Sequence, residues 1–417
     1  MNVSKIVNDT EIMDYVEIVT KAYPGMMNNS PESKTKLYDS LLKRLREDDS
    51  IEFHGLFREN KLVGAMRLHS YQMNLFSKLI DVGGIGLVAV DLLHKKEKIA
   101  KELVLNFINE FKKKNVNMVL LYPFRPDFYK KMGFGYGSKM HQYSISPSSF
   151  QNGSTKEHLR YLSIEDKEEL YNCYTRYAMS NHGMFLKTEF ELETMFKNPD
   201  VHLVGYFEEG VMKGYVTFSF KKLSDTNFVY NDLVIKELIF EKKEALNEIA
   251  TFLHTQTDQI HRIIWNTQEE NIHFMIQDPR NGTNNLIPPV YHESHLSGVG
   301  LMYRIINIKG IIKDLEFHNF NHSNGKFKLK LIDTFLVENN VELVIHVENG
   351  RMNVVQEGHY DVELSIDVSD FSSMVMGAVT LKELYYYSKL ELSDEAYLNE
   401  LNTIFLVSEK PKCISIF

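Results

Sequence analysis

The sequence predicts an α/β protein in which two similar α/β blocks precede a third block of mixed α+β structure. The first observation is a strand–helix–strand order in the N-terminal third of the chain. The second is that this order recurs farther along, and the third is a series of closely spaced strand patterns near the C-terminus. The length of 417 residues suits about three domains, at roughly 150 residues each. We therefore expect domains at 1–150, 151–290 and 291–417.

The first block combines helical segments, apolar strands and one strongly amphipathic helix. Apolar residues recur at helical spacing from Ile99 to Phe111, and three lysines close that helix, as its dipole favours. The stretch 84–90 is almost continuously apolar, which is typical of a buried strand. The expected helices lie at 10–22, 33–46 and 99–111, and the expected strands at 51–58, 62–71, 84–90, 118–122 and 140–145.

The second block repeats the first. Phe57 and Gly64 correspond to Phe207 and Gly214 at a constant offset of 150 residues. A strand at 233–240, a helix at 243–257 and a strand at 261–266 then follow, as in the first block. The two copies differ after the central strand, because the first has a lysine-rich turn and the second has no comparable cluster. If one copy binds a phosphorylated ligand, we expect it to be the first.

The third block is rich in strands. Asn349-Gly350 is a hairpin signal between two of them, and Ser369 is a plausible N-cap for a helix at 369–378. Turn-rich stretches at 147–154 and 278–289 separate the blocks. The remaining expected strands lie at 301–306, 325–332, 341–348, 351–356, 362–367 and 413–417, and further helices begin near 381 and 394.

The composition is that of a soluble globular protein, with 43% hydrophobic and 25% charged residues. A net charge of −9 argues against a general nucleic-acid binder. The two cysteines, Cys173 and Cys413, offer neither a metal-binding spacing nor a disulfide framework, so we expect no metal. The N-terminus lacks a signal-peptide pattern and no run of 18 apolar residues occurs. We expect a cytoplasmic protein that does not enter a membrane.

The order of elements, together with Tyr-x-x-x-Gly-Phe at 129–134, resembles the GNAT acyltransferase superfamily. The partial doubling and the final α+β block make the whole chain similar to the Eis family of N-acetyltransferases. That family has a GNAT domain, a degenerate second GNAT domain and a sterol-carrier-protein-like domain. The resemblance implies direct acetyl transfer from acetyl-CoA to an amine, on aminoglycoside- or polyamine-like cations or on lysine side chains. It also implies a homohexamer.

The lysine-rich turn is the candidate phosphate site. Lysines at a helix start interact unfavourably with the helix dipole. An anion bound to the free backbone N–H groups there would compensate for this cost. A solvated lysine face is the alternative. The resemblance assigns acetyl-CoA to the backbone of the central strand and to the turn and loop beyond it, at Val88, Ala89, Val90, Lys96, Glu97, Lys98, Ile99, Ala100, Lys101, Phe124 and Arg125. Lys98 replaces the family's glycine, so a non-catalytic ligand-binding protein, or a structural hexamer component, stays an alternative.

Two residues carry the expected catalysis. Tyr129 precedes Gly133-Phe134 at the family spacing, which implies an acid that protonates the departing CoA thiolate. A packing role is its alternative, and Tyr122 and Tyr136 are its neighbouring rivals. The apolar tail ending at Phe417 suggests a terminus held in the fold, and the resemblance implies that its α-carboxylate accepts the amine's proton. A strand whose carboxylate lies in solvent is the alternative there.

Overall fold

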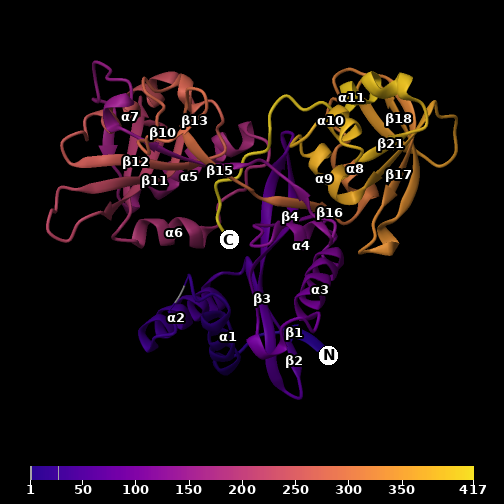
Figure 1. The fold of residues 1–417 in the computed structure, drawn as a ribbon, viewed down its shortest axis with the longest axis horizontal. Coiled ribbons are helices and arrows are strands. Elements are labelled where there is room, and N and C mark those ends of the chain that lie inside the picture. Colours follow the sequence, from indigo (N-terminus) through magenta and orange to yellow (C-terminus); the bar gives the residue numbers. More distant parts are fainter. Residues whose placement is uncertain (1, 27) are drawn as a thin grey trace. The chain divides into compact units, whose positions relative to one another are not determined.

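The computed structural model describes residues 2–26 and 28–417 (Figure 1). The chain forms two compact units. The first contains Met1–Gly137, Leu301–Pro411 and Ser415–Phe417, and the second contains Ser138–Gly300 and Lys412–Ile414. In the described residues, no helix is both long and apolar enough to cross a membrane.

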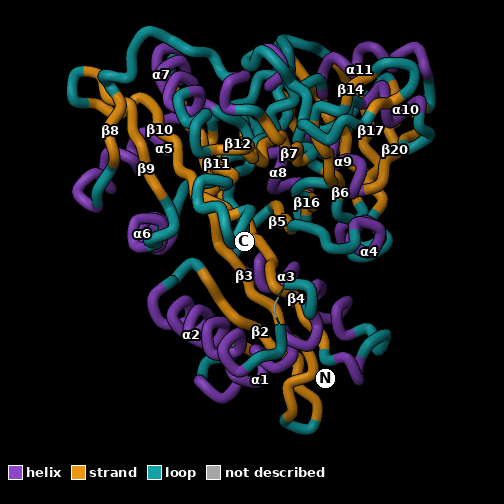
Figure 2. Tube along the Cα trace, turned by 60° about the vertical axis from the view of Figure 1, so that its left-hand side comes forward, coloured by secondary structure: helices purple, strands orange, loops and turns teal. Residues whose placement is uncertain are grey.

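The first unit contains a seven-stranded sheet in the order β1-β2-β3-β4-β5-β16-β6. Its strands are β1 (Asn2–Lys5), β2 (Ile51–Arg58), β3 (Lys61–Leu75), β4 (Lys78–Val90), β5 (Met118–Leu121), β6 (Gly135–Tyr136) and β16 (Met302–Ile305). Its helices are α1 (Asp9–Ala22), α2 (Pro31–Glu47), α3 (Ile99–Lys113) and α4 (Pro126–Lys130). The long strands β3 and β4 run side by side (Figure 2). Neighbouring residues of β3 point to opposite faces, so Ala65 joins the α1–α2 core while Met66 joins the α3 core.

One strand expected in the first block pairs elsewhere. Residues 140–145 do form a strand, but it pairs with β12 in the sheet of the second unit. In the first sheet, β16 lies between β5 and β6. Local alternation of apolar and polar residues decides that a segment is extended, whereas long-range contacts decide which strand it pairs with.

The second unit repeats this architecture in a sheet of order β15-β7-β12-β11-β10-β9-β8. Among the described residues of this sheet, β11 and β12 are the parallel pair, as β4 and β5 are in the first sheet. The strands are β7 (Met140–Ile145), β8 (Leu159–Tyr161), β9 (His202–Glu208), β10 (Val211–Lys222), β11 (Asn231–Phe240), β12 (Ile260–Thr267) and β15 (His295–Gly298). The helices are α5 (Lys167–Ser180), α6 (Glu189–Lys197) and α7 (Lys243–His254), and a small hairpin joins β13 (Leu286–Ile287) to β14 (Tyr291–His292).

The C-terminal part of the first unit has a five-stranded sheet in the order β19-β18-β17-β20-β21. Its strands are β17 (Gly325–Ile332), β18 (Val341–Glu348), β19 (Arg351–Val355), β20 (Val362–Asp367) and β21 (Leu390–Leu392). Its helices are α8 (Ile308–Asp314), α9 (Val368–Val375), α10 (Leu381–Tyr386) and α11 (Leu398–Phe405).

Two local predictions in this part were wrong. The N-cap of α9 is Asp367 and not Ser369, because the Asp367 carboxylate accepts the backbone N–H of Ser369 at 2.8 Å. Residues 413–417 form no strand. Their backbone groups bond to side chains instead: the Tyr122 hydroxyl donates to the carbonyl of Ser415, and the N–H of Cys413 donates to Gln268.

Candidate functional site

A pocket of about 600 Å³ lies in the first unit where β4 ends and α3 begins. Its walls contain all but two of the predicted cofactor residues, namely Val88, Val90, Lys96, Lys98, Ile99, Ala100, Lys101, Phe124 and Arg125. Lys95, part of the lysine-rich turn, also lines the pocket. The sequence did not assign four further lining residues, namely Ala22, Tyr23, His94 and Phe128, to the site. Tyr23 carries no sequence signal, because it comes from a helix far upstream of the lysine-rich turn.

The pocket begins where two parallel strands separate. β4 pairs with β5 only from Val82 to Ile85, although β4 itself continues to Val90. The pairing of β3 with β4 shifts register close to this point, where Leu87 has a φ of 50°. Such a bulge bends a strand away from its neighbour. The last residues of β4 therefore have one backbone edge that does not pair with β5.

Tyr15 of α1 and Tyr23, the C-cap residue of that helix, contact the bulged segment. The Tyr15 hydroxyl donates to the carbonyl of Leu87 at 2.5 Å, and the Tyr23 hydroxyl donates to the carbonyl of Val88. Burial raises the pKa of both phenols, so both are protonated donors at neutral pH. Helix α1 thereby fixes the backbone that forms one wall of the pocket.

Ala89 and Glu97 are the two predicted residues outside the pocket lining. The Ala89 side chain is buried in the α1–α2 core, so only its backbone is near the opening. Glu97 forms an ion pair with Arg58. The hydrogen bond from Arg58 lowers the pKa of the Glu97 carboxyl, which keeps the carboxylate ionised and engaged with this partner. Its charge is therefore partly compensated beside the lysines.

The turn before α3 adopts the conformation that favours glycine. Lys96 and Lys98 both have a φ of 66°, and Lys98 is the N-cap residue of the helix. A side chain in this left-handed region costs about 1–2 kcal/mol, which explains why glycine suits the position. The N-cap makes no side-chain hydrogen bond, so the first-turn N–H groups of the described helix remain free of a cap. The turn therefore presents N–H groups and lysine charges to the same pocket.

Tyr129 lies on α4 behind the pocket wall. Its ring is 2% exposed and contacts the rings of Phe124 and Phe128, whose centroids lie 5.8 and 5.2 Å away. Burial, with a smaller contribution from Tyr23, raises the pKa of the Tyr129 phenol. The hydroxyl is therefore protonated at neutral pH. Of its rivals, Tyr122 bonds to the tail at 2.8 Å and Tyr136 is 41% exposed.

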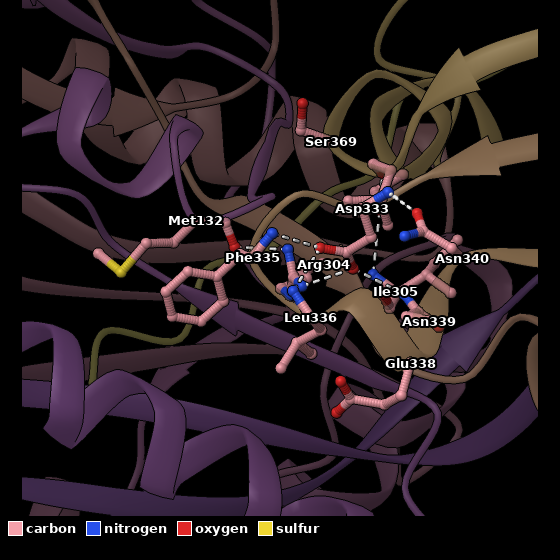
Figure 3. Close-up of polar contacts among 12 residues, drawn as sticks. Met132, Arg304, Ile305, Asp333, Phe335, Leu336, Glu338, Asn339, Asn340 and Ser369 are labelled. Atoms are coloured by element: carbon pink, nitrogen blue, oxygen red, sulfur yellow. Dashed lines mark hydrogen bonds and ion pairs between the residues drawn. The ribbon is translucent and has the colours of Figure 1, made fainter.

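A buried arginine holds the turn that follows Tyr129 (Figure 3). Arg304 on β16 is 0% exposed, and its guanidinium donates to the carbonyl of Met132 and to Asp333 Oδ2, the latter at 2.7 Å. Asn339 donates to the same carboxylate oxygen at 2.9 Å. Gly133 has a φ of 80°, and a Cβ there would lie 1.3 Å from an Arg304 nitrogen. The glycine of the Gly-Phe pair thus makes room for this arginine.

The end of the chain packs into the first unit. The Phe417 ring lies 5.3, 5.5 and 5.2 Å from the rings of His69, Tyr71 and Tyr122. A Cβ on Gly86 of β4 would lie 3.0 Å from the carboxyl carbon of Phe417. The glycine therefore leaves room for the Phe417 carboxyl group beside the strand. The alternative of a sheet-completing strand is not observed.

A polar chain lies beneath the Phe417 ring. Arg67 Nε donates to His69 Nε2 at 2.8 Å, and the Tyr71 hydroxyl lies 3.0 Å from His69 Nδ1. Burial and then the charge of Arg67 lower the pKa of His69 well below its usual value. His69 is therefore neutral at pH 7, and the proton on its ring must be on Nδ1, because Nε2 accepts from Arg67.

Comparison with known proteins identifies the domains. Residues 4–137 and residues 183–305 each match a model of an acetyltransferase (GNAT) domain. The chain is a GNAT acetyltransferase. Residues 308–414 match a sterol carrier protein domain. The tandem GNAT domains and the third domain predicted from the sequence are thereby confirmed.

Solved structures share the whole fold of this acetyltransferase. A conserved protein from Enterococcus faecalis, described as a probable N-acyltransferase, has a TM-score of 0.79 at 18% identity, covering 100% of this chain and 99% of its own. A GCN5-related N-acetyltransferase from Anabaena variabilis has a TM-score of 0.79 at 17% identity, and Eis1 from Mycobacterium abscessus has 0.72 at 15%, each covering 100% of both chains. No curated protein matches the sequence.

In a GNAT acetyltransferase, the donor is acetyl-CoA. The pocket offers this acetyltransferase an anion-binding helix start, an unpaired strand edge and an aromatic wall in one place. These three features suit, in turn, a pyrophosphate, an amide-containing arm and an apolar or ring-bearing group. The residues present therefore fit acetyl-CoA chemically.

Proposed function

We propose that the first GNAT domain transfers an acetyl group from acetyl-CoA directly to the primary amine of a cationic acceptor. The acceptor is either a small molecule of the aminoglycoside or polyamine kind or a lysine side chain. The observation that carries the proposal is the pocket in which the part of β4 that is not paired with β5 meets the uncapped, lysine-rich start of α3.

The donor binds by two kinds of contact in this proposal. The pyrophosphate accepts hydrogen bonds from the first-turn N–H groups of α3 and is neutralised by Lys96, Lys98 and Lys101. The pantetheine arm adds to the free edge of β4 in the manner of a β-strand. Phe124 and Arg125 also line the pocket.

Transfer requires that a proton leave the amine and that a proton reach the sulfur. We assign the first task to the Phe417 carboxylate, which is ionised at pH 7 and attracts an ammonium ion. We assign the second to Tyr129. A phenol with a raised pKa is a weaker acid than a thiol, whose pKa is about 8.5. Tyr129 therefore does not leave its proton on the thiolate at equilibrium. It donates a hydrogen bond to the sulfur as the carbon–sulfur bond breaks and charge develops there, and the proton that the amine loses balances the released thiolate through solvent.

Calorimetry with acetyl-CoA tests the donor site. Lys96→Glu should weaken binding, and it should do so more at low salt than at high salt, because exposed charges are screened by ions. Lys243→Glu is the matched control, since Lys243 occupies the corresponding helix start of the second domain. Equal affinities of both variants and the wild type would refute the phosphate assignment.

A thiol-release assay then identifies the acceptor. A panel of aminoglycosides, polyamines and lysine peptides should contain at least one amine that releases CoA. Acetyl-CoA binding without release for any primary amine would contradict the proposed transfer.

We also propose a homohexamer, on the family resemblance, and light scattering should then give six times the chain mass of 48.6 kDa.

A further inference from the structure

The second GNAT domain has the same strand opening as the first but uses it differently. β11 pairs with β12 only as far as Ile235, although β11 continues to Phe240 and β12 to Thr267. At this opening lies a cavity of about 180 Å³. Two of its lining residues, Lys412 and Ile414, come from the end of the chain.

Residues 412–414 are held there by both backbone and side chains. The N–H of Lys412 donates to the carbonyl of His182 at 2.7 Å, and its ammonium forms an ion pair with Glu269 at 2.5 Å. The N–H of Cys413 donates to Gln268 Oε1 at 2.5 Å. The Cys413 side chain is 1% exposed, and Ile414 packs against the apolar cluster beneath α5. Two successive backbone donors are satisfied, the Cys413 side chain is buried, and those of Lys412 and Ile414 are half-buried, as in extended peptides that proteins bind.

The same opening is unsuited to acetyl-CoA. Ligand pockets usually measure about 300–1,000 Å³, which exceeds the space left beside the tail. Glu237 and Glu269 line the cavity and offset the charges of Lys236 and Lys412, so this opening lacks the excess of positive charge that would attract a pyrophosphate. At the start of α7, Lys242 is engaged in an ion pair with Glu208 at 2.6 Å. Charge and space therefore both favour a peptide over the nucleotide donor.

We propose that the second GNAT domain is a binding site for the chain's own residues 412–414. Only three residues follow Ile414, and three extended residues span at most about 10 Å. A tail bound at Ile414 therefore keeps the Phe417 carboxylate within this short distance of Ile414. The use of this placement in transfer rests on the proposed function of Phe417, whereas the binding of residues 412–414 does not.

Tryptic release of the tail tests the binding itself. Lys410 precedes a proline, which blocks cleavage, so the susceptible bond in this segment is Lys412–Cys413. Intact-mass measurement follows the loss of Cys413–Phe417 over time. Gln268→Leu removes the acceptor of the Cys413 N–H, and Glu269→Gln removes the charge opposite Lys412 while keeping its shape. Each variant should accelerate release on the order of tenfold. Gln151→Leu, at an exposed position of the same unit, should leave the rate unchanged.

Turnover and acetyl-CoA affinity separate the two proposals. If both hold, Gln268→Leu speeds tail release, lowers turnover and leaves acetyl-CoA affinity unchanged. Unchanged release in both Gln268→Leu and Glu269→Gln would overturn the binding site. Faster release with wild-type turnover would support the binding site and refute the proposed role of Phe417.

Discussion

Replacing Arg304 by leucine should open the region around β16 and the turn after Tyr129. Arg304 and Asp333 form an ion pair in which both side chains are 0% exposed. The variant therefore leaves the Asp333 carboxylate buried without its cationic partner. Breaking a buried pair on one side costs about 3–5 kcal/mol. Asp333 keeps the backbone N–H groups of Phe335 and Leu336 and the amide of Asn339, which places the expected cost at the lower end of that range.

Hydrogen exchange read by mass spectrometry measures this cost locally. A loss of about 3 kcal/mol corresponds to roughly 10²-fold faster exchange of protected amides, and we expect it in peptides covering 118–137 and 301–340. Arg304→Lys keeps the charge but offers one nitrogen in place of the two that bond Met132 and Asp333, so its effect should be intermediate. The single tryptophan, Trp265, belongs to the second unit, so its fluorescence reports separately on that unit.

Arg46→Leu is the matched control in the same unit. Arg46 and Asp9 form an exposed pair, with side chains 61% and 58% exposed, so its loss should cost less than about 1 kcal/mol. The reasoning would be refuted if Arg304→Leu changed exchange no more than Arg46→Leu does. A destabilised Arg304→Leu protein should also show lower turnover, because the arginine holds the carbonyl of Met132 next to Tyr129.

Three further predictions concern the proposed active site. Tyr129→Phe should lower turnover by about 10²–10⁴-fold with little change in acetyl-CoA affinity, because the phenol acts only during transfer. Deleting Phe417, or extending the chain beyond it, should abolish transfer in a folded protein that still binds acetyl-CoA. Lys98→Gly should raise the free energy of unfolding by about 1 kcal/mol, because glycine accepts a φ of 66° without the steric cost that lysine meets.

Each of these outcomes has a clear opposite. Wild-type turnover in Tyr129→Phe would return Tyr129 to a packing role. Full activity in a C-terminally extended protein would remove Phe417 from the catalytic residues. Denaturant titration of Lys98→Gly that shows lower stability would mean that the Lys98 side chain makes contacts worth more than the backbone cost, and Lys95→Gly, in extended backbone, is the control.

The sequence by itself determined many of the helices and strands, since period and composition act locally, although the strand expected at 413–417 does not form. The helix from Ile99, the strand ending at Val90 and the repeat beginning at Phe207 are all present in the structure. The lysine-rich turn also lies at the predicted pocket, because strand, turn and helix are contiguous in the chain. Local physics suffices where neighbours in sequence are neighbours in space.

Only the tertiary structure decided which distant segments meet. Strand 140–145 pairs with β12, and β16 supplies Arg304 to a turn more than a hundred residues upstream. Tyr23, the C-cap residue of α1, lines the pocket, and the Phe417 ring contacts the His69 ring. Such pairings depend on complementary packing and on the requirement that buried polar groups have hydrogen-bond partners. Neither requirement produces a periodic pattern of residues in the sequence.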